Sequence, residues 1–160
     1  MKNNFIYGKE NQKLFNLAKE KKFALPAINV SGNNTINSVL ETSSELNSPV
    51  IIQFSNGGSQ FIAGKGMSNK NFKASIAGSV AGAYHIHKVI DNYNSKVIIH
   101  TDHCSRSILP WIDGLLDYGK VFYKKKIDYD ELQKYNNIIL NIKKSYKQNP
   151  RKITIVFTNI

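Results

Sequence analysis

A regular alternation of short apolar runs with longer helical patterns is the feature that most constrains the fold of this chain. The apolar runs cover residues 23–30, 50–54 and 97–102, and segments with apolar residues at helical spacing precede or separate them. Parallel strands need long crossover connections, which are usually helices, so this order predicts an α/β fold with a parallel sheet. The pattern alone leaves open whether the sheet is doubly wound or closed into a barrel.

Helices are expected over residues 11–22, in the segment after Asn33, over residues 71–93 and over residues 108–118. The second of these has an apolar stripe, which consists of Ile36, Val39, Leu40 and Leu46. The third is rich in small residues that permit close packing against a neighbour, namely Ala77, Gly78, Ala81 and Gly82. Each helix therefore has a face that can cover a sheet or another helix.

The strand over residues 50–54 has the composition of a strand that is covered on both faces. Residues 55–58 are expected to form a turn, followed by a loop with Gly64 and Gly66. Gly57 and Gly58 within that turn would let the backbone approach a ligand, although a plain turn explains them equally well. Pro26 weakens the prediction of the first strand, because proline cannot donate a hydrogen bond to a neighbouring strand.

Composition restricts the class of protein. The chain has 160 residues, 41% of them hydrophobic, which is enough for one globular domain with a core. It has no apolar run of about 18 residues, so we expect no membrane span. It also lacks the apolar stretch of a signal peptide, and Cys104 is its only cysteine. A cytoplasmic protein without disulfides is the simplest prediction.

The formal charge of +11 is concentrated toward the end of the chain. Residues 121–160 contain nine lysines and arginines against three acidic residues, and they contain none of the ten glycines. This shift in composition divides the chain into residues 1–120 and a basic tail. The tail still shows helical spacing over residues 132–146 and strand composition over 153–157. A non-catalytic basic binding module is therefore an alternative, although no nucleic-acid recognition motif is present and we do not expect nucleic-acid binding.

The strongest candidate for chemistry is the segment of residues 100–104, His-Thr-Asp-His-Cys, at the end of an apolar strand. Ligands bind at the carboxyl ends of parallel strands in barrels and in open sheets. Asp102 and His103 can serve one site only if the strand ends or bulges between them, because neighbouring strand residues point to opposite faces. A histidine beside a carboxylate suits a metal and a proton-transfer group, but buried or capping polar groups would look the same.

Several segments together resemble class II fructose-bisphosphate aldolases. Residues 97–104 resemble the first signature of that family, an apolar strand that ends in His-x-Asp-His. Three other segments resemble the family's first strand, its second strand with the following loop, and the segment after the signature: residues 23–29, 54–66 and 109–117. The matches are collinear over about residues 11–120. They favour the fructose-bisphosphate type over the tagatose type.

The resemblance implies an incomplete (β/α)8 TIM barrel containing the first three to four βα units. It also implies zinc-dependent, reversible cleavage of fructose 1,6-bisphosphate to dihydroxyacetone phosphate and glyceraldehyde 3-phosphate in glycolysis. In such enzymes zinc binds the ketose carbonyl. By this resemblance His103 matches a zinc ligand and Asp102 the catalytic acid/base, while Asn29 and Ser55 match positions that contact the sugar-phosphate substrate. Full-length members are expected to be homodimers.

The sequence departs from the family after residue 120. A barrel of this type usually needs about 250 residues. The family's remaining zinc ligands are two histidines and a glutamate further along the chain, and no histidine follows His103 in this sequence. We therefore expect an incomplete zinc ligand set and an inactive chain on its own. Residues 121–160 are either a diverged continuation or an out-of-frame reading, and the loss of glycine with the gain of lysine favours the second.

Two residue types that often mark active sites have plainer explanations here. His87 falls on the apolar stripe of the third helix and is expected to be a packed core histidine. Cys104 is expected to be a small packed residue, because no partner that would activate a nucleophilic thiol is evident beside it. Neither is therefore counted among the candidate site residues.

Overall fold

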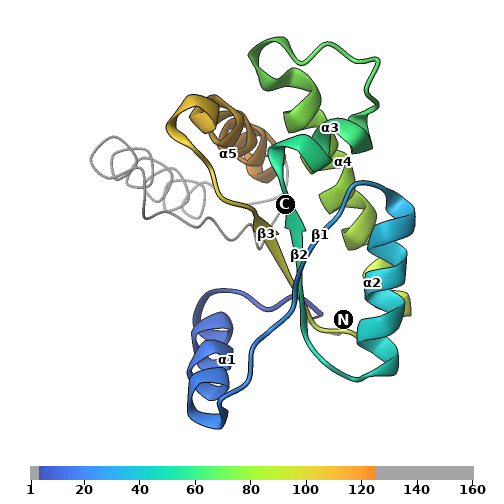
Figure 1. Ribbon diagram of the computed structural model, residues 1–160, viewed down its shortest axis with the longest axis vertical. Helices are drawn as coiled ribbons and strands as arrows, with labels where there is room; N and C mark the ends of the chain where they lie inside the picture. The colour runs from blue at the N-terminus through green and yellow to red at the C-terminus, as the bar shows by residue number, and fades with distance from the viewer. Residues whose placement is uncertain (1–3, 125–160) are drawn as a thin grey trace.

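The computed structural model describes residues 4–124, so the expected tail elements over residues 132–146 and 153–157 lie outside the described residues. Helices and strands alternate along this part of the chain (Figure 1). Their order is α1 Gly8–Lys21, β1 Ala27–Asn29, α2 Asn33–Glu45, β2 Val50–Phe54, α3 Asn56–Ala63, α4 Lys73–Val89, β3 Val97–Thr101 and α5 Leu109–Lys124. Short 3-10 turns flank the last two βα units: Lys70–Phe72, Ile90–Asn92 and Arg106–Ile108.

The strands form one sheet in the order β1-β2-β3, and both pairings are parallel. The expected α/β fold with a parallel sheet is confirmed. β1 is short and lies at an edge, where Pro26 can accept a hydrogen bond from Ile51 N–H through its carbonyl without needing to donate one. The pairing register places Asn29 beside Gln53 and Gln53 beside His100.

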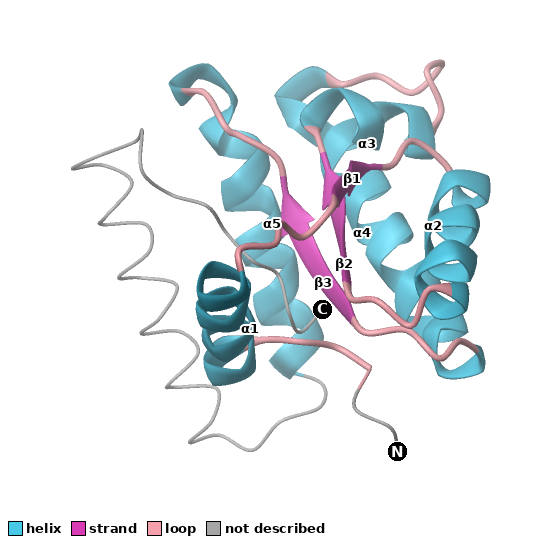
Figure 2. Ribbon diagram, turned by 60° about the horizontal axis from the view of Figure 1, so that its bottom comes forward, coloured by secondary structure: helices cyan, strands magenta, loops and turns pink. Residues whose placement is uncertain are grey.

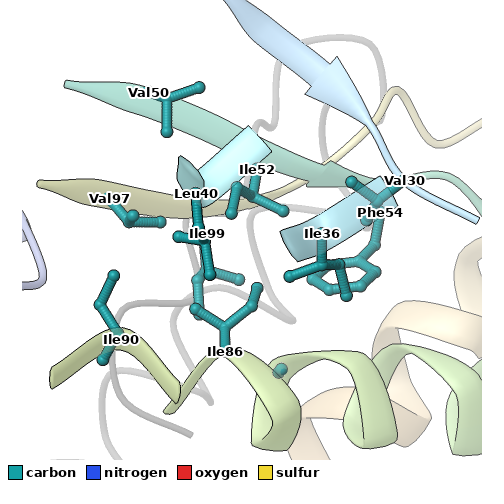
Figure 3. Packing of buried hydrophobic residues seen from close by; sticks show 11 residues of the cluster. Val30, Ile36, Leu40, Val50, Ile52, Phe54, Ile86, Ile90, Val97 and Ile99 are labelled. Atoms are coloured by element: carbon teal, nitrogen blue, oxygen red, sulfur yellow. The ribbon is translucent and has the colours of Figure 1, made fainter. Parts of the chain in front are cut away.

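One face of the sheet forms the main core. Val50, Ile52 and Phe54 of β2 point toward α2 and α4 and are buried. They pack with Ile36 and Leu40 of α2, and with Ile86 and Ile90 (Figure 3). α1 lies apart from α2 and α4, across the sheet from them (Figure 2). The expectation that β2 is covered on both faces is wrong for the described residues, because Ile51 and Gln53 on its other face are only partly buried.

Two glycines of α4, Gly78 and Gly82, allow α3 and β2 to lie close to this helix because they have no side chain. A β-carbon at Gly78 would lie 2.7 Å from the carbonyl carbon of Ser59 in α3, and one at Gly82 would lie 2.9 Å from Cζ of Phe54 and closer still to Cε1 of that ring. Ala77 and Ala81, the two alanines that were expected to allow close packing, are exposed. The glycine positions are therefore the ones that set the distance between α4 and its neighbours.

The expected turn over residues 55–58 is wrong, because this segment starts α3, whereas Gly64 and Gly66 lie in a loop as expected. Ser55 is the N-cap of the helix, and its Oγ accepts a hydrogen bond from the N–H of Gly58 at 3.0 Å. Serine, asparagine and glycine are favoured both in turns and at helix starts, so composition did not separate the two. Packing against α4 supplies the contacts that favour the helix.

A second core lies between α4 and α5. Trp111 is fully buried there, and its indole N–H donates to Ser79 Oγ at 3.2 Å. It packs with Val80, Ile112 and Leu115. No helix of the described part of the chain has both the length and the apolar character that crossing a membrane requires.

Leu46 does not belong to the buried stripe of α2, contrary to expectation. It follows the last residue of the helix and is 70% exposed. It lines an apolar hollow of about 400 Å³ beside β1, together with Pro26, Ile28, Val39 and Pro49. Helical spacing places a residue on a face but does not determine whether another element covers that face.

Candidate functional site

The candidate site residues gather at one edge of the sheet. Asn29 is the last residue of β1, Ser55 follows the last residue of β2, and Asp102 and His103 follow the last residue of β3. The three strands are parallel neighbours, so their carboxyl ends meet along the same edge. All four residues singled out by sequence therefore lie where a ligand of a parallel α/β protein binds.

Asp102 and His103 meet the condition set by strand geometry, because β3 ends just before them at Thr101. The N–H of Asp102 still donates to the carbonyl oxygen of Phe54 at 2.8 Å, which fixes the residue beside β2. Its carboxylate turns back and accepts the N–H of His103 at 2.7 Å. The side chain of Asp102 is 22% exposed and that of His103 is 90% exposed. The carboxylate is thus held by the backbone, while the imidazole is accessible.

The surroundings of Asp102 favour its ionised form. Burial raises the pKa of this carboxyl, but the hydrogen bonds from His103 N–H and from the Asn29 side chain lower it, as do the two neighbouring imidazoles. The lowering effects prevail, so the pKa of Asp102 lies below its usual value. At neutral pH this side chain is a carboxylate that can accept a proton.

Three polar side chains, one from each strand, form a hydrogen-bonded row that ends at Asp102. Asn29 Nδ2 donates to Asp102 Oδ2 at 3.1 Å, and Gln53 Nε2 donates to Asn29 Oδ1 at 2.9 Å. Gln53 Oε1 lies 2.7 Å from Nδ1 of His100. Burial lowers the pKa of His100, and the charge of Asp102 opposes this only in part. Sequence reasoning did not single out Gln53, although a polar residue inside an apolar strand was the available signal.

The start of α3 explains one of the two glycines in the expected turn. A β-carbon at Gly58 would lie 2.7 Å from the carbonyl oxygen of Val30, so this position needs glycine for the helix to approach the end of β1. Gly57 has open space around its α-carbon. The half-buried hydroxyl of Ser55 sits at this junction as the helix cap. Helix packing, rather than a plain turn, accounts for Gly58.

The described residues do not make a metal site by themselves. Within residues 4–124, no three histidine, cysteine, aspartate or glutamate side chains are grouped so that they could hold a metal ion. His85 and His87 lie on α4, where Nε2 of His85 is 2.7 Å from Asn37 Oδ1 and the ring of His87 is 4.2 Å from that of Phe5. Catalytic zinc takes three protein ligands, and His103 would supply only one.

Cys104 belongs to the packing beside the site rather than to its chemistry. Its side chain packs against the cluster around Trp111. Burial raises the pKa of the Cys104 thiol, and the nearby carboxylate of Asp113 adds to this. A raised pKa disfavours the thiolate, which is the reactive form.

Comparison with known proteins decides the family. Residues 9–145 match the family model described as fructose-bisphosphate aldolase class-II. The chain belongs to the class II fructose-bisphosphate aldolase family. It is 53% identical over 116 residues to fructose-bisphosphate aldolase class 2 of Escherichia coli K12, a match that covers 72% of this chain and 32% of the relative. It is 56% identical over 121 residues to the protein of that name from Buchnera aphidicola subsp. Schizaphis graminum, covering 74% and 34%.

A solved aldolase shows the same arrangement of elements. The chain is similar to the crystal structure of fructose-bisphosphate aldolase from Campylobacter jejuni, with a TM-score of 0.68 and 48% sequence identity. The match covers 76% of this chain and 34% of that one. The expected fold, the first βα units of an incomplete (β/α)8 barrel, is confirmed. The aldolase chain described here spans about a third of the length of the relatives it matches, and its division at residue 120 stays a prediction.

Proposed function

We propose that these residues form part of the active site of a class II aldolase, a lyase that reversibly cleaves fructose 1,6-bisphosphate to dihydroxyacetone phosphate and glyceraldehyde 3-phosphate. The observation that carries the proposal is the Asp102 carboxylate. This carboxylate accepts hydrogen bonds from the Asn29 side chain and from the N–H of His103, at the edge where three parallel strands end. Membership of the aldolase family supports this reaction over other uses of a lone carboxylate.

Asp102 is the proposed acid/base. In the cleavage direction it takes the proton from the hydroxyl on the carbon that becomes the aldehyde. The carbon–carbon bond breaks as that C=O bond forms, and the electron pair stays on the triose phosphate. The carbon that holds this pair then takes up a proton, from a group outside residues 4–124 or from water, and dihydroxyacetone phosphate leaves. In the reverse direction Asp102 returns the proton to the new hydroxyl. Its lowered pKa suits it to the first role at neutral pH.

Asn29 and Ser55 are proposed to contact the sugar-phosphate substrate. Ser55 Oγ already accepts a hydrogen bond from Gly58 N–H, so its own proton can be donated to a phosphate oxygen. His103 is proposed to supply one zinc ligand, because its imidazole is exposed at the same edge. The described residues do not complete the ligand set, so the other ligands are proposed to come from outside residues 4–124.

Complementation tests this proposal. The chain is mixed with zinc and with a separately produced polypeptide that carries the part of the E. coli relative beyond the matched segment. We expect no cleavage of fructose 1,6-bisphosphate by either polypeptide alone and measurable cleavage by the mixture. Asp102→Asn should remove that activity, since an amide cannot take the proton. Asp91→Asn, at an exposed position before the amino end of β3, is the matched control and should leave activity intact.

Two results would count against the proposal. Full activity of the Asp102→Asn mixture would show that this carboxylate is not the acid/base. A mixture that associates by size-exclusion chromatography but has no activity would show that these residues do not complete an aldolase site.

A cytoplasmic location and a homodimer remain predictions. The alternative, a basic binding module, depends on residues 121–160 and predicts tight RNA binding that weakens steeply with salt.

A further inference from the structure

The polar row at the edge of the sheet has a regular geometry. Asn29, Gln53 and His100 occupy the same register position on β1, β2 and β3, so their side chains emerge side by side on one face of the sheet. Each contacts the next at 2.9 Å or less: Gln53 Nε2 to Asn29 Oδ1, and His100 Nδ1 to Gln53 Oε1. Asn29 then reaches the carboxylate of Asp102. The row spans the whole width of the described sheet.

The chemistry of the carboxylate fixes the direction of every hydrogen bond in the row. An ionised carboxylate can only accept, so Asn29 must turn its NH2 group toward Asp102. The carbonyl oxygen of Asn29 then faces Gln53, which must offer its own NH2 group. Gln53 therefore turns its oxygen toward His100, and Nδ1 of His100 must carry a proton. Each side chain therefore donates to the next in the order His100, Gln53, Asn29 and Asp102.

We propose that His100 and Gln53 are positioning residues, which hold the Asn29 amide with its NH2 group toward Asp102. Without Gln53, the exposed Asn29 amide loses the partner of its oxygen and is held only through its NH2 group. The amide can then rotate away from Asp102, so the carboxylate is no longer held in one position. Only the catalytic consequence rests on the proposed function. The orientation of the row is a property of this chain and can be measured without activity.

The tautomer of His100 is the first test. In the 15N-labelled chain at pH 7.5, correlation of the ring nitrogens with the ring protons shows which nitrogen is protonated. We expect the Nδ1–H form for His100, and a shift toward Nε2–H, the form preferred in free histidine, in Gln53→Met. His85 is the internal reference, because its Nε2 faces the oxygen of Asn37 and should carry the proton. An Nε2–H form of His100 in the unmodified chain would overturn the proposal.

Rescue by a conservative variant is the second test. His100→Asn keeps an N–H donor near the place of Nδ1, whereas His100→Leu of similar size does not. In the complemented enzyme we expect kcat to fall about tenfold for His100→Leu and Gln53→Met, with KM changed by less than about twofold, and to recover largely in His100→Asn. Gln53→Glu should also lower kcat, because a carboxylate draws the Asn29 NH2 group toward itself.

The two tests separate the possible failures. If every mixture is inactive but His100 is the Nδ1–H form, the proposed function fails and the orientation of the row stands. If Gln53→Met has unchanged kcat while its amide spectrum shows an intact fold, positioning by the row is refuted. Equal losses in His100→Asn and His100→Leu would mean that shape, rather than the donor, matters at this position, and would also refute it.

Discussion

Replacement of Gly78 by alanine tests how closely α3 and α4 pack. The added β-carbon would lie 2.7 Å from the carbonyl carbon of Ser59 and 3.1 Å from the backbone nitrogen of Ala63. Both contacts are with backbone, which cannot rotate away, and the carbonyl oxygen of Ser59 lies closer still, so α3 must shift away from α4 before the alanine fits. Overpacking of this kind costs about 1–3 kcal/mol, and alanine recovers about 0.5–1 kcal/mol through helix propensity. We expect a net loss of about 1–2 kcal/mol in the free energy of unfolding.

Trp111 gives this prediction a local readout. It is the only tryptophan, it is fully buried, and it is hydrogen-bonded to Ser79, the residue next to Gly78. Urea unfolding of each variant at one protein concentration, followed by tryptophan fluorescence and circular dichroism, measures the loss. We expect a lower midpoint for Gly78→Ala and a red-shifted emission before unfolding, because the movement of α3 loosens the serine contacts beside the indole.

Two other glycines serve as controls. Gly57→Ala adds a β-carbon in open space within α3 and should raise stability slightly. Gly114→Ala meets Cγ1 of Ile76 at 2.8 Å, but that side chain can rotate, so an intermediate effect is expected. If Gly78→Ala is as stable as Gly57→Ala and its emission is unchanged, the close approach of α3 and α4 is not present in solution and the reasoning fails.

Three further predictions concern single side chains. Burial lowers the pKa of His100, so the unfolded chain binds more protons just below pH 6.5; stability should fall on acidification through that window, and less so in His100→Asn. Urea titrations at pH 7 and pH 5.5 measure this, and equal pH dependence of the two proteins would contradict it. Leu40→Ala should cost about 2–5 kcal/mol because Leu40 is fully buried, whereas Leu46→Ala at a 70% exposed site should cost less than about 0.5 kcal/mol; similar costs would show that the apolar hollow is covered in solution. Cys104 should react with iodoacetamide at pH 8 roughly several-fold more slowly in the folded chain than in urea, because burial raises the pKa of its thiol. Equal rates in the two conditions would refute this.

The alternation of strands and helices could be predicted because each apolar run is separated from the next by segments of helical spacing. The failures arose where one composition serves two structures. Residues 55–58 contain serine, asparagine and glycine, which start helices as readily as they form turns, and the choice depends on packing against Gly78 of α4. Leu46 failed for a related reason, because coverage of a helix face depends on elements that are distant in sequence.

The site was predictable only in part from the residues themselves. They pointed to the segment of residues 100–104, and the family resemblance then added Asn29 and Ser55 and gave Asp102 and His103 their roles, which remain predictions. The structure brings all four to one edge. The local signal at Gln53 was a polar residue inside an apolar strand, but its place between Asn29 and His100 depends on the pairing register of three strands, which the local sequence does not show.

The hydroxyl group of Ser55 has one structural role, as the cap of α3, and one proposed role in substrate binding. Its oxygen caps α3 by accepting a hydrogen bond from Gly58 N–H, and its proton is the part that we propose contacts a phosphate of the substrate. We therefore expect a substitution of Ser55 to have two effects, a less stable start of α3 and weaker binding of the substrate phosphate. Ser55→Ala removes both contributions, whereas Ser55→Asp keeps the cap and repels the anion. Loss of catalysis would therefore remove only one of the two restrictions on this position, because the cap of α3 would still be needed.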